Sequence, residues 1–129
     1  MYVGNNEAKV RKIGYNGILV PGDVVVALFP FSNLEAEKAR PAVVVAVPDG
    51  INVLLAEMTS KRGKDRWAVY VGKEHILHGE LSGYPAWIWT SQLFTAARSV
   101  IGQKVARIKR VKMDEVRQRI VSLATKVNF

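Results

Sequence analysis

The pattern of hydrophobic positions predicts several short strands followed by a single helix. The run at 23–29, DVVVALF, is continuously apolar rather than alternating, which indicates a strand buried on both faces. Residues 72–85 contain three glycines and Pro85, and they are interpreted as a loop. Further strands are predicted at 42–47, 51–58, 67–71, 86–90 with an extension towards 93, and 103–108.

A tight turn is predicted between the second and third strands. Pro48 presets its own φ, Asp49 can bond to the following backbone, and Gly50 can supply a positive φ. The turn would join the strands at 42–47 and 51–58 into a hairpin. Pro41 opens the second strand and forces Arg40 into an extended conformation.

The C-terminal region has a helical pattern instead. Val116, Ile120, Leu123 and Val127 recur at helical spacing, and Asp114 with Glu115 is expected in the first turn, where acids complement the helix dipole. Short strands with tight turns followed by one helix predict a mostly β fold with a C-terminal helix, a small barrel. We expect one domain at 21–129 preceded by an N-terminal extension at 1–20.

Charge and composition narrow the function. The 129-residue chain has a formal net charge of +8, and residues 61–129 hold fourteen Lys or Arg against five acids. Such a field attracts polyanions, although basic surfaces also serve solubility alone. The chain has no cysteine, which excludes disulfides and fits a cytoplasmic location. No apolar run approaches the length of a membrane helix, and residues 1–17 lack the apolar centre of a secretory signal.

Familiar catalytic and metal-binding patterns are absent. The two histidines, His75 and His78, have no thiol or third histidine beside them, so we interpret them as loop residues rather than ligands. There is no GxSxG, P-loop or GxGxxG motif. Neither a metal nor a cofactor is expected.

Polar residues at strand ends form the candidate site. Arg40 directly precedes a predicted strand, and Thr59 directly follows the next one. In the predicted hairpin both fall at the end opposite the turn, where they can be cross-strand neighbours. A guanidinium and a hydroxyl at a barrel rim can hold a phosphate, although an Arg and a Thr at strand ends are often structural.

Three motifs in order resemble the PemK/MazF family, the toxins of type II toxin–antitoxin modules. They are GDVVVALFPFSNLEAEKARPAVVVA from residue 22, Glu57-Met58-Thr59-Ser60, and WTSQLFTA at 89–96, within a span of roughly 21–127. The resemblance implies a twisted SH3-like barrel, usually a homodimer, that cleaves single-stranded RNA without metal. It also implies that Arg40 and Thr59 are the catalytic pair. The segment 61–85 has no firm match, which leaves the choice of RNA sequence open.

RNA binding is assigned to the chain that follows Thr59 and to the third motif. Lys104–Lys112 is a second basic run, either an RNA track or a solvated strand and turn. We interpret Trp87 and Trp89, which share one face of a strand, as core residues, and Trp67 as the better stacking candidate. The predicted RNA-binding residues are Ser60, Lys61, Arg62, Lys64, Arg66, Trp67 and Gln92.

The expected reaction is attack of the RNA 2′-OH on the adjacent phosphorus. Arg40 would stabilise charge on the phosphoryl oxygens, and Thr59 would hold a phosphate oxygen or orient the 2′-OH. Asp65, Glu57 and His75 are candidates for proton transfer. A cognate antitoxin with an acidic, disordered tail is the expected protein partner. The alternative is a non-catalytic SH3-like module that binds nucleic acid or protein with the same fold.

Overall fold

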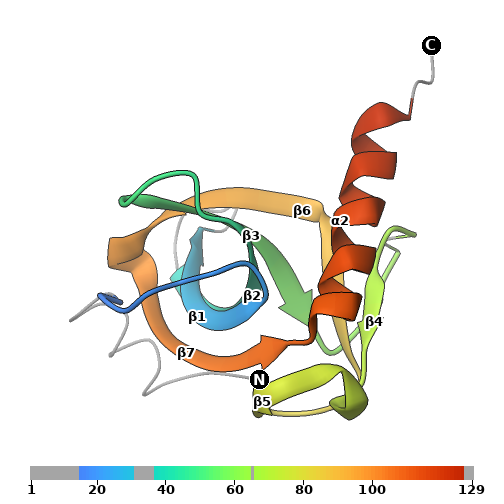
Figure 1. The fold of residues 1–129 in the computed structure, drawn as a ribbon, viewed down its shortest axis with the longest axis horizontal. Coiled ribbons are helices and arrows are strands. Elements are labelled where there is room, and N and C mark those ends of the chain that lie inside the picture. The colour runs from blue at the N-terminus through green and yellow to red at the C-terminus, as the bar shows by residue number, and fades with distance from the viewer. Residues whose placement is uncertain (1–14, 31–36, 65, 127–129) are drawn as a thin grey trace.

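A computed structural model of the chain describes residues 15–30, 37–64 and 66–126, and it contains a single curled sheet and one long helix (Figure 1). The strands are β1 (Asp23–Pro30), β2 (Glu37–Ala46), β3 (Asn52–Thr59), β4 (Val69–Val71), β5 (Ile76–Gly79), β6 (Ala86–Ala97) and β7 (Ile101–Ile108). The helices are the 3₁₀ helices η1 (Lys73–His75) and η2 (Arg98–Val100) and the α-helix α2 (Arg110–Thr125).

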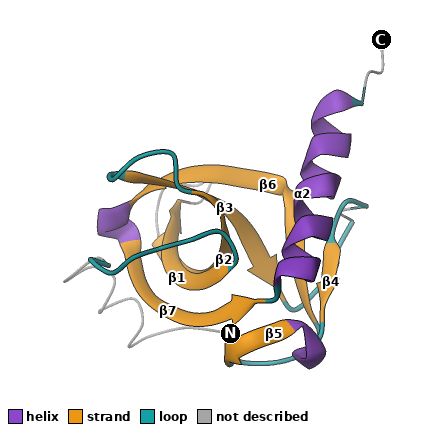
Figure 2. Ribbon diagram, in the orientation of Figure 1, coloured by secondary structure: helices purple, strands orange, loops and turns teal. Residues whose placement is uncertain are grey.

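All seven strands belong to one antiparallel sheet in the order β4-β6-β3-β2-β1-β7-β5. The sheet curls around β1, and α2 packs beside β6 and β4 (Figure 2). Its two edge strands, β4 and β5, are consecutive in the chain and are joined through η1. The predicted mostly β fold with a small barrel and a C-terminal helix is confirmed.

The sheet buries both of its faces around β1. Val24 packs in one apolar cluster with Ile88 and with Met113 of α2, whereas Val25 packs in a second cluster inside the curl. Every residue from Val24 to Phe29 is buried, as the continuous apolar run predicted. The two clusters make β1 the centre of the fold.

The hairpin of β2 and β3 is confirmed, with two corrections. Asp49 Oδ1 accepts hydrogen bonds from the backbone N–H groups of Ile51 and Asn52, both 2.7 Å long, and Gly50 does not have the predicted positive φ. Pro41 lies within β2, not at its start. The register between β2 and β3 ends at Ala42 and Glu57, directly after this proline, which has no N–H to extend it.

Two other segments differ from the sequence predictions. Residues 72–85 contain η1 and β5 and are not wholly loop, because β5 pairs with β7 along the edge of the sheet. Helix α2 begins at Arg110, so Asp114 and Glu115 lie beyond its first turn and pair with basic residues of the helix instead. Val127 is outside the described residues. No helix in the described part of the chain is long and apolar enough to cross a membrane.

Candidate nucleic-acid interface and catalytic site

Arg40 and Thr59 lie at the same end of the β2–β3 ladder. The last paired residues are Ala42 and Glu57. Arg40 lies two residues beyond Ala42 within β2, and Thr59 lies two residues beyond Glu57 at the end of β3. Because side chains alternate along strands, Arg40, Glu57 and Thr59 share the face that carries Ala42 and Leu55. They therefore form a polar rim beside the cluster inside the curl, at the end of the hairpin where Arg40 and Thr59 were predicted to lie.

Glu57 is the acidic member of this rim. Its Oε2 lies 3.7 Å from Arg40 Nη1, and its side chain is only 16% exposed, against 38% for Arg40. Burial raises the pKa of the Glu57 carboxyl above its ordinary value, and the positive charge of Arg40 opposes that shift only in part. The rim thus places a cation beside a carboxyl group whose ionisation is disfavoured by burial.

The Thr59 hydroxyl is oriented by the chain that follows it. Thr59 Oγ1 accepts a hydrogen bond of 3.2 Å from the backbone N–H of Lys61, which leaves the hydroxyl proton available for donation. Thr59 is half-buried, whereas Ser60 is exposed. This turn holds the hydroxyl at the end of β3.

The loop after Thr59 is fixed to β6 by its backbone. Trp89 Nε1 donates to the carbonyl of Arg62 at 2.9 Å, and the buried Thr90 Oγ1 donates to the carbonyl of Trp67 at 2.7 Å. Gly63 has φ +62° and packs on Trp89, where an added Cβ would lie 3.0 Å from the indole. Four predicted RNA-binding cations are exposed on this loop: Lys61, Arg62, Lys64 and Arg66.

The tryptophans differ from their predicted roles. Trp87 and Trp89 lie on the half-exposed face of β6, while Ala86, Ile88 and Thr90 alternate into the buried face, so the prediction that both tryptophans are core residues is wrong. Trp87 is the cross-strand neighbour of Thr59, and the Arg62 guanidinium lies 5.9 Å from its ring centroid.

Trp67 and Gln92 are the two remaining residues of the predicted RNA-binding set. Trp67 is half-buried, and Nζ of Lys126, the residue after the end of α2, lies 5.7 Å from its ring centroid. Gln92 is exposed in the irregular stretch of β6 opposite Glu57, where the β3–β6 register shifts between Ala56 and Met58. Gln92 therefore neighbours the rim through Glu57.

The second basic run, 104–112, is divided between structural and exposed positions. Arg107 Nε lies 2.7 Å from Asp23 Oδ1, and Lys104 Nζ lies 3.3 Å from Asp23 Oδ2. Lys112 bonds to Glu115 at 2.8 Å, whereas Lys109 and Arg110 are exposed. This run is therefore neither a simple solvated strand nor a continuous row of exposed cations.

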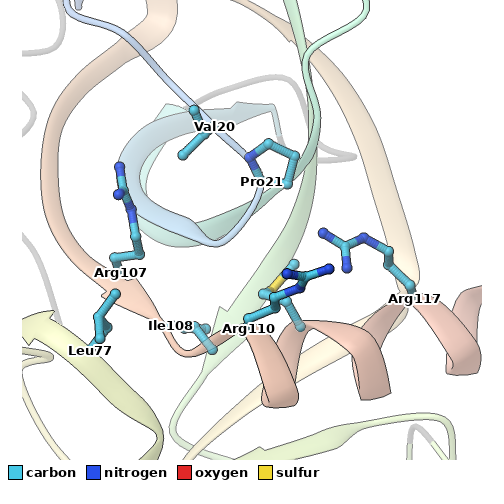
Figure 3. A pocket seen from close by; sticks show the side chains of 8 residues that line it. Val20, Pro21, Leu77, Arg107, Ile108, Arg110 and Arg117 are labelled. Carbon is cyan, nitrogen blue, oxygen red and sulfur yellow. The ribbon is translucent and has the colours of Figure 1, made fainter.

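A pocket of about 520 Å³ lies near the start of β1, away from Arg40, which pairs with Ala27 further along that strand (Figure 3). Arginines from β7 and α2 surround an apolar floor, but Arg107 is paired with Asp23 and Arg117 with Asp114. The lining residues are Val20, Pro21, Leu77, Arg107, Ile108, Arg110, Met113 and Arg117.

The remaining candidates for metal binding or proton transfer are arranged differently. His75 Nδ1 accepts a hydrogen bond of 2.9 Å from the backbone N–H of Gly72, and His78 is exposed on β5. Within the described ranges no three His, Asp or Glu residues gather into a possible metal site. Asp65 lies outside those ranges.

Sequence reasoning missed Tyr70 altogether. It is the cross-strand neighbour of Trp87 on β4, and it is 41% exposed. An alternating VYV triplet between two tryptophan-bearing segments was the available pattern, but the pairing of β4 with β6 could not be read from it.

Comparison with known proteins gives one family. A family model described as "PemK-like, MazF-like toxin of type II toxin-antitoxin system" matches residues 20–123. No curated protein sequence matches the chain significantly.

Several solved structures share the fold at low sequence identity. An endoribonuclease from mycobacterial species has a TM-score of 0.64 at 13% identity, and the match covers 87% of this chain and 97% of that one. An endoribonuclease in complex with its cognate antitoxin, also mycobacterial, gives 0.63 at 13%, with 86% and 100% covered. The MazE–MazF structure from Deinococcus radiodurans gives 0.62 at 17%, with 87% and 100% covered.

Proposed function

Because the chain belongs to the PemK-like, MazF-like toxin family of type II toxin–antitoxin systems, we propose that it is an endoribonuclease acting on single-stranded RNA. The observation that carries this proposal is the rim of Arg40, Glu57 and Thr59 beside an exposed basic loop. Similar folds are found in proteins named as endoribonucleases. RNA as the substrate makes the cytoplasm the site of action.

The proposed reaction uses the 2′-OH of the RNA as the nucleophile. That oxygen attacks the adjacent phosphorus, the bond to the 5′ oxygen breaks, and a 2′,3′-cyclic phosphate forms without metal. Arg40 stabilises the charge that grows on the phosphoryl oxygens, an effect worth about 3 kcal/mol for one well-placed donor. Thr59, held by the Lys61 N–H, donates its hydroxyl to a phosphate oxygen or orients the 2′-OH.

The exposed basic loop after Thr59 and the residues near it supply the contacts to the RNA strand. We assign phosphate binding to Lys61, Arg62, Lys64 and Arg66, which can track a backbone without reading its sequence. The other residues assigned to RNA binding are Ser60, Trp67 and Gln92. DNA of the same sequence would bind but would not be cut, because it lacks the 2′-OH.

Glu57 is the best-placed carboxyl for proton transfer. It lies beside Arg40, on the face that carries Thr59, and its raised pKa brings it closer to the range in which a group exchanges protons near neutrality. His75 is a weaker choice because its Nδ1 already accepts a bond from Gly72.

The test is cleavage of a mixed-sequence RNA by Arg40→Ala and Thr59→Ala, with Arg117→Ala and Thr125→Ala as matched controls on α2. We expect each rim variant to lose at least about a hundredfold in rate while its unfolding midpoint is unchanged. The controls should cut normally. Wild-type rates for a rim variant would refute its assigned role.

The nature of the ends tests the mechanism separately. Cleavage should persist in excess EDTA, and the upstream product should carry a 2′,3′-cyclic phosphate. A 3′-hydroxyl with a 5′-phosphate, or loss of activity with chelator, would refute 2′-OH attack.

A non-catalytic module is the second candidate, because the basic loop alone can bind nucleic acid. In that case the wild-type protein would retain a single strand of RNA without cutting it, and Arg40→Ala would change only the affinity. Binding without cleavage over a range of RNA sequences would favour this reading.

We also propose a homodimer regulated by an antitoxin. An acidic, disordered tail with apolar anchors would compete with RNA for a surface that includes Arg40, Arg62 and Lys64, and salt would weaken its association. Residues 1–20 would be an extension to the catalytic domain at 21–129. Simultaneous binding of RNA and antitoxin at full affinity would contradict a shared surface, and a monomer at micromolar concentration would contradict the dimer.

A further inference from the structure

We propose that Trp87 and Tyr70 form a stacking platform that binds the nucleobases next to the phosphate held at Thr59. The inference deepens the proposed ribonuclease function and rests on it for the identity of the phosphate. It concerns β6 and β4, outside the polar rim and outside the basic loop. The observation behind it is an uninterrupted line of side chains across three strands.

The strand register creates that line. Thr59 of β3 pairs with Trp87 of β6, and Trp87 pairs in turn with Tyr70 of β4. Residues directly opposite one another in an antiparallel sheet project to the same face. Neighbouring strands are spaced about 4.8 Å apart, so the Trp87 backbone lies about one such spacing from that of Thr59, and the Tyr70 backbone lies two. These positions cover the distance from a phosphate at Thr59 to its adjoining bases.

The rings contact one another, and a cation lies beside each of them. Tyr70 and Trp87 have centroids 5.5 Å apart at 71°, and Tyr70 meets His75 at 5.8 Å and 88°. Arg62 lies 5.9 Å from the Trp87 centroid, and Lys112 Nζ lies 6.0 Å from the Tyr70 centroid. Edge-to-face packing fixes the rings in place before a ligand arrives.

The chemistry of this surface suits a nucleobase. Proteins that bind single strands combine aromatic side chains, on which the bases stack, with cations that attract the phosphates. Here Arg62 is the exposed cation, whereas Lys112 is buried and bonded to Glu115. Arg62 is exposed, so it can move to cover a base stacked on Trp87. Stacking is tolerant of sequence, so this platform would strengthen binding of any unpaired strand.

The test separates base stacking from phosphate binding. A labelled single-stranded DNA of mixed sequence, which is not cut, is compared with an abasic strand of the same length. We expect Trp87→Leu and Tyr70→Leu each to weaken binding of the base-bearing strand about tenfold, with less than about a twofold effect on the abasic strand. Trp87→Phe, which keeps a ring, should bind nearly as well as wild type.

Tyr15→Leu is the matched control. Tyr15 also has a lysine 6.0 Å from its ring centroid, but its backbone N–H bonds to Arg98 O, at the end of the barrel remote from Thr59. It should bind both strands like wild type. Urea unfolding of every variant shows whether the fold is retained.

Three results would overturn the platform. The first is an equal loss of affinity for the base-bearing and the abasic DNA strand, and the second is unchanged binding of the base-bearing strand. The third is dissociation of a dimer by Tyr70→Leu, which would make this face an interface between copies of the chain. Failure of the proposed function would look different. The wild-type protein would then leave RNA intact while base-dependent binding of DNA still required Trp87 and Tyr70.

Discussion

Replacing Asp23 with asparagine should destabilise the protein strongly without touching the candidate site. The Asp23 side chain is fully buried. Its Oδ2 accepts a 2.9 Å bond from the Val20 N–H and lies 3.3 Å from Lys104 Nζ, and its Oδ1 accepts a 2.7 Å bond from Arg107 Nε. Asparagine has the same shape, but it carries no charge and only one acceptor oxygen.

The expected loss follows from these contacts. A hydrogen bond to a charged group contributes about 1.5–3 kcal/mol, and removing one member of a buried ion pair costs about 3–5 kcal/mol. Arg107 and Lys104 retain side-chain exposures of 32% and 24%, so water replaces part of what they lose. We therefore expect a loss of about 2–4 kcal/mol at neutral pH, or roughly 10 °C in the melting temperature for a chain of this size.

The pH dependence provides the sharper assay. Burial alone would raise the pKa of Asp23, but the bonds from Arg107 and Val20, with the charges of Lys104 and Arg107, outweigh burial and hold the pKa below its ordinary value. The ionised carboxylate therefore stabilises the fold above the unfolded-state value of 3.8, and that stabilisation is lost as the pH falls through the folded-state pKa. Urea unfolding of both proteins should give curves that converge in acid.

Asp49→Asn is the matched control. Asp49 is exposed, and an asparagine oxygen can still accept the two backbone bonds of the turn, so the loss should be much smaller. An Asp23→Asn protein within about 0.5 kcal/mol of wild type at neutral pH, or a difference that does not change with pH, would refute the reasoning.

Three other changes have defined outcomes. Glu57→Gln should abolish the acid limb of the pH–rate profile of RNA cleavage, since that limb would report ionisation of Glu57 as the proton acceptor. Because burial raises the pKa of Glu57, the variant should also gain stability relative to wild type as the pH rises, measured by urea unfolding. Ile88→Ala should cost about 2–5 kcal/mol in the same measurement, because Ile88 is fully buried between the sheet and α2. Thr90→Val should cost about 1 kcal/mol and should speed tryptic cleavage of the basic loop, because the Trp67 carbonyl loses its donor; an unchanged rate of proteolysis would contradict the role of that bond.

Local patterns predicted every strand but β5, and they predicted the family, since both depend on residues close together in the chain. The run at 23–29 became β1 because continuous apolar sequence requires burial on two faces, and the motifs within 21–127 are confirmed by the family match over 20–123. Arg40 and Thr59 were brought to one rim by a single hairpin, whose register a short turn fixes. Their catalytic roles stay a prediction.

The pairing of strands that are far apart in the chain could not be predicted from the sequence. The pairing of β5 with β7 depends on the curl of the whole sheet, so a segment with three glycines was interpreted as loop. Trp87 was assigned to the core because tryptophan is apolar, but the neighbours that decide its face, Thr59 and Tyr70, come from other strands. Asp23 showed no sign of its ion pairs, because Lys104 and Arg107 are some eighty residues away.

The loop that follows Thr59 is hydrogen-bonded to β6 through the carbonyls of Arg62 and Trp67. Trp89 and Thr90, the two donors, belong to β6 and would remain if the loop residues between those carbonyls were exchanged. The backbone path of this segment is thus separable from the identity of its side chains, apart from Gly63, whose positive φ and close contact with Trp89 favour glycine. A library randomised at Lys61, Lys64 and Arg66 alone would replace exposed side chains of the loop while the hydrogen bonds to β6 are kept, which makes this segment a natural place to introduce new binding contacts.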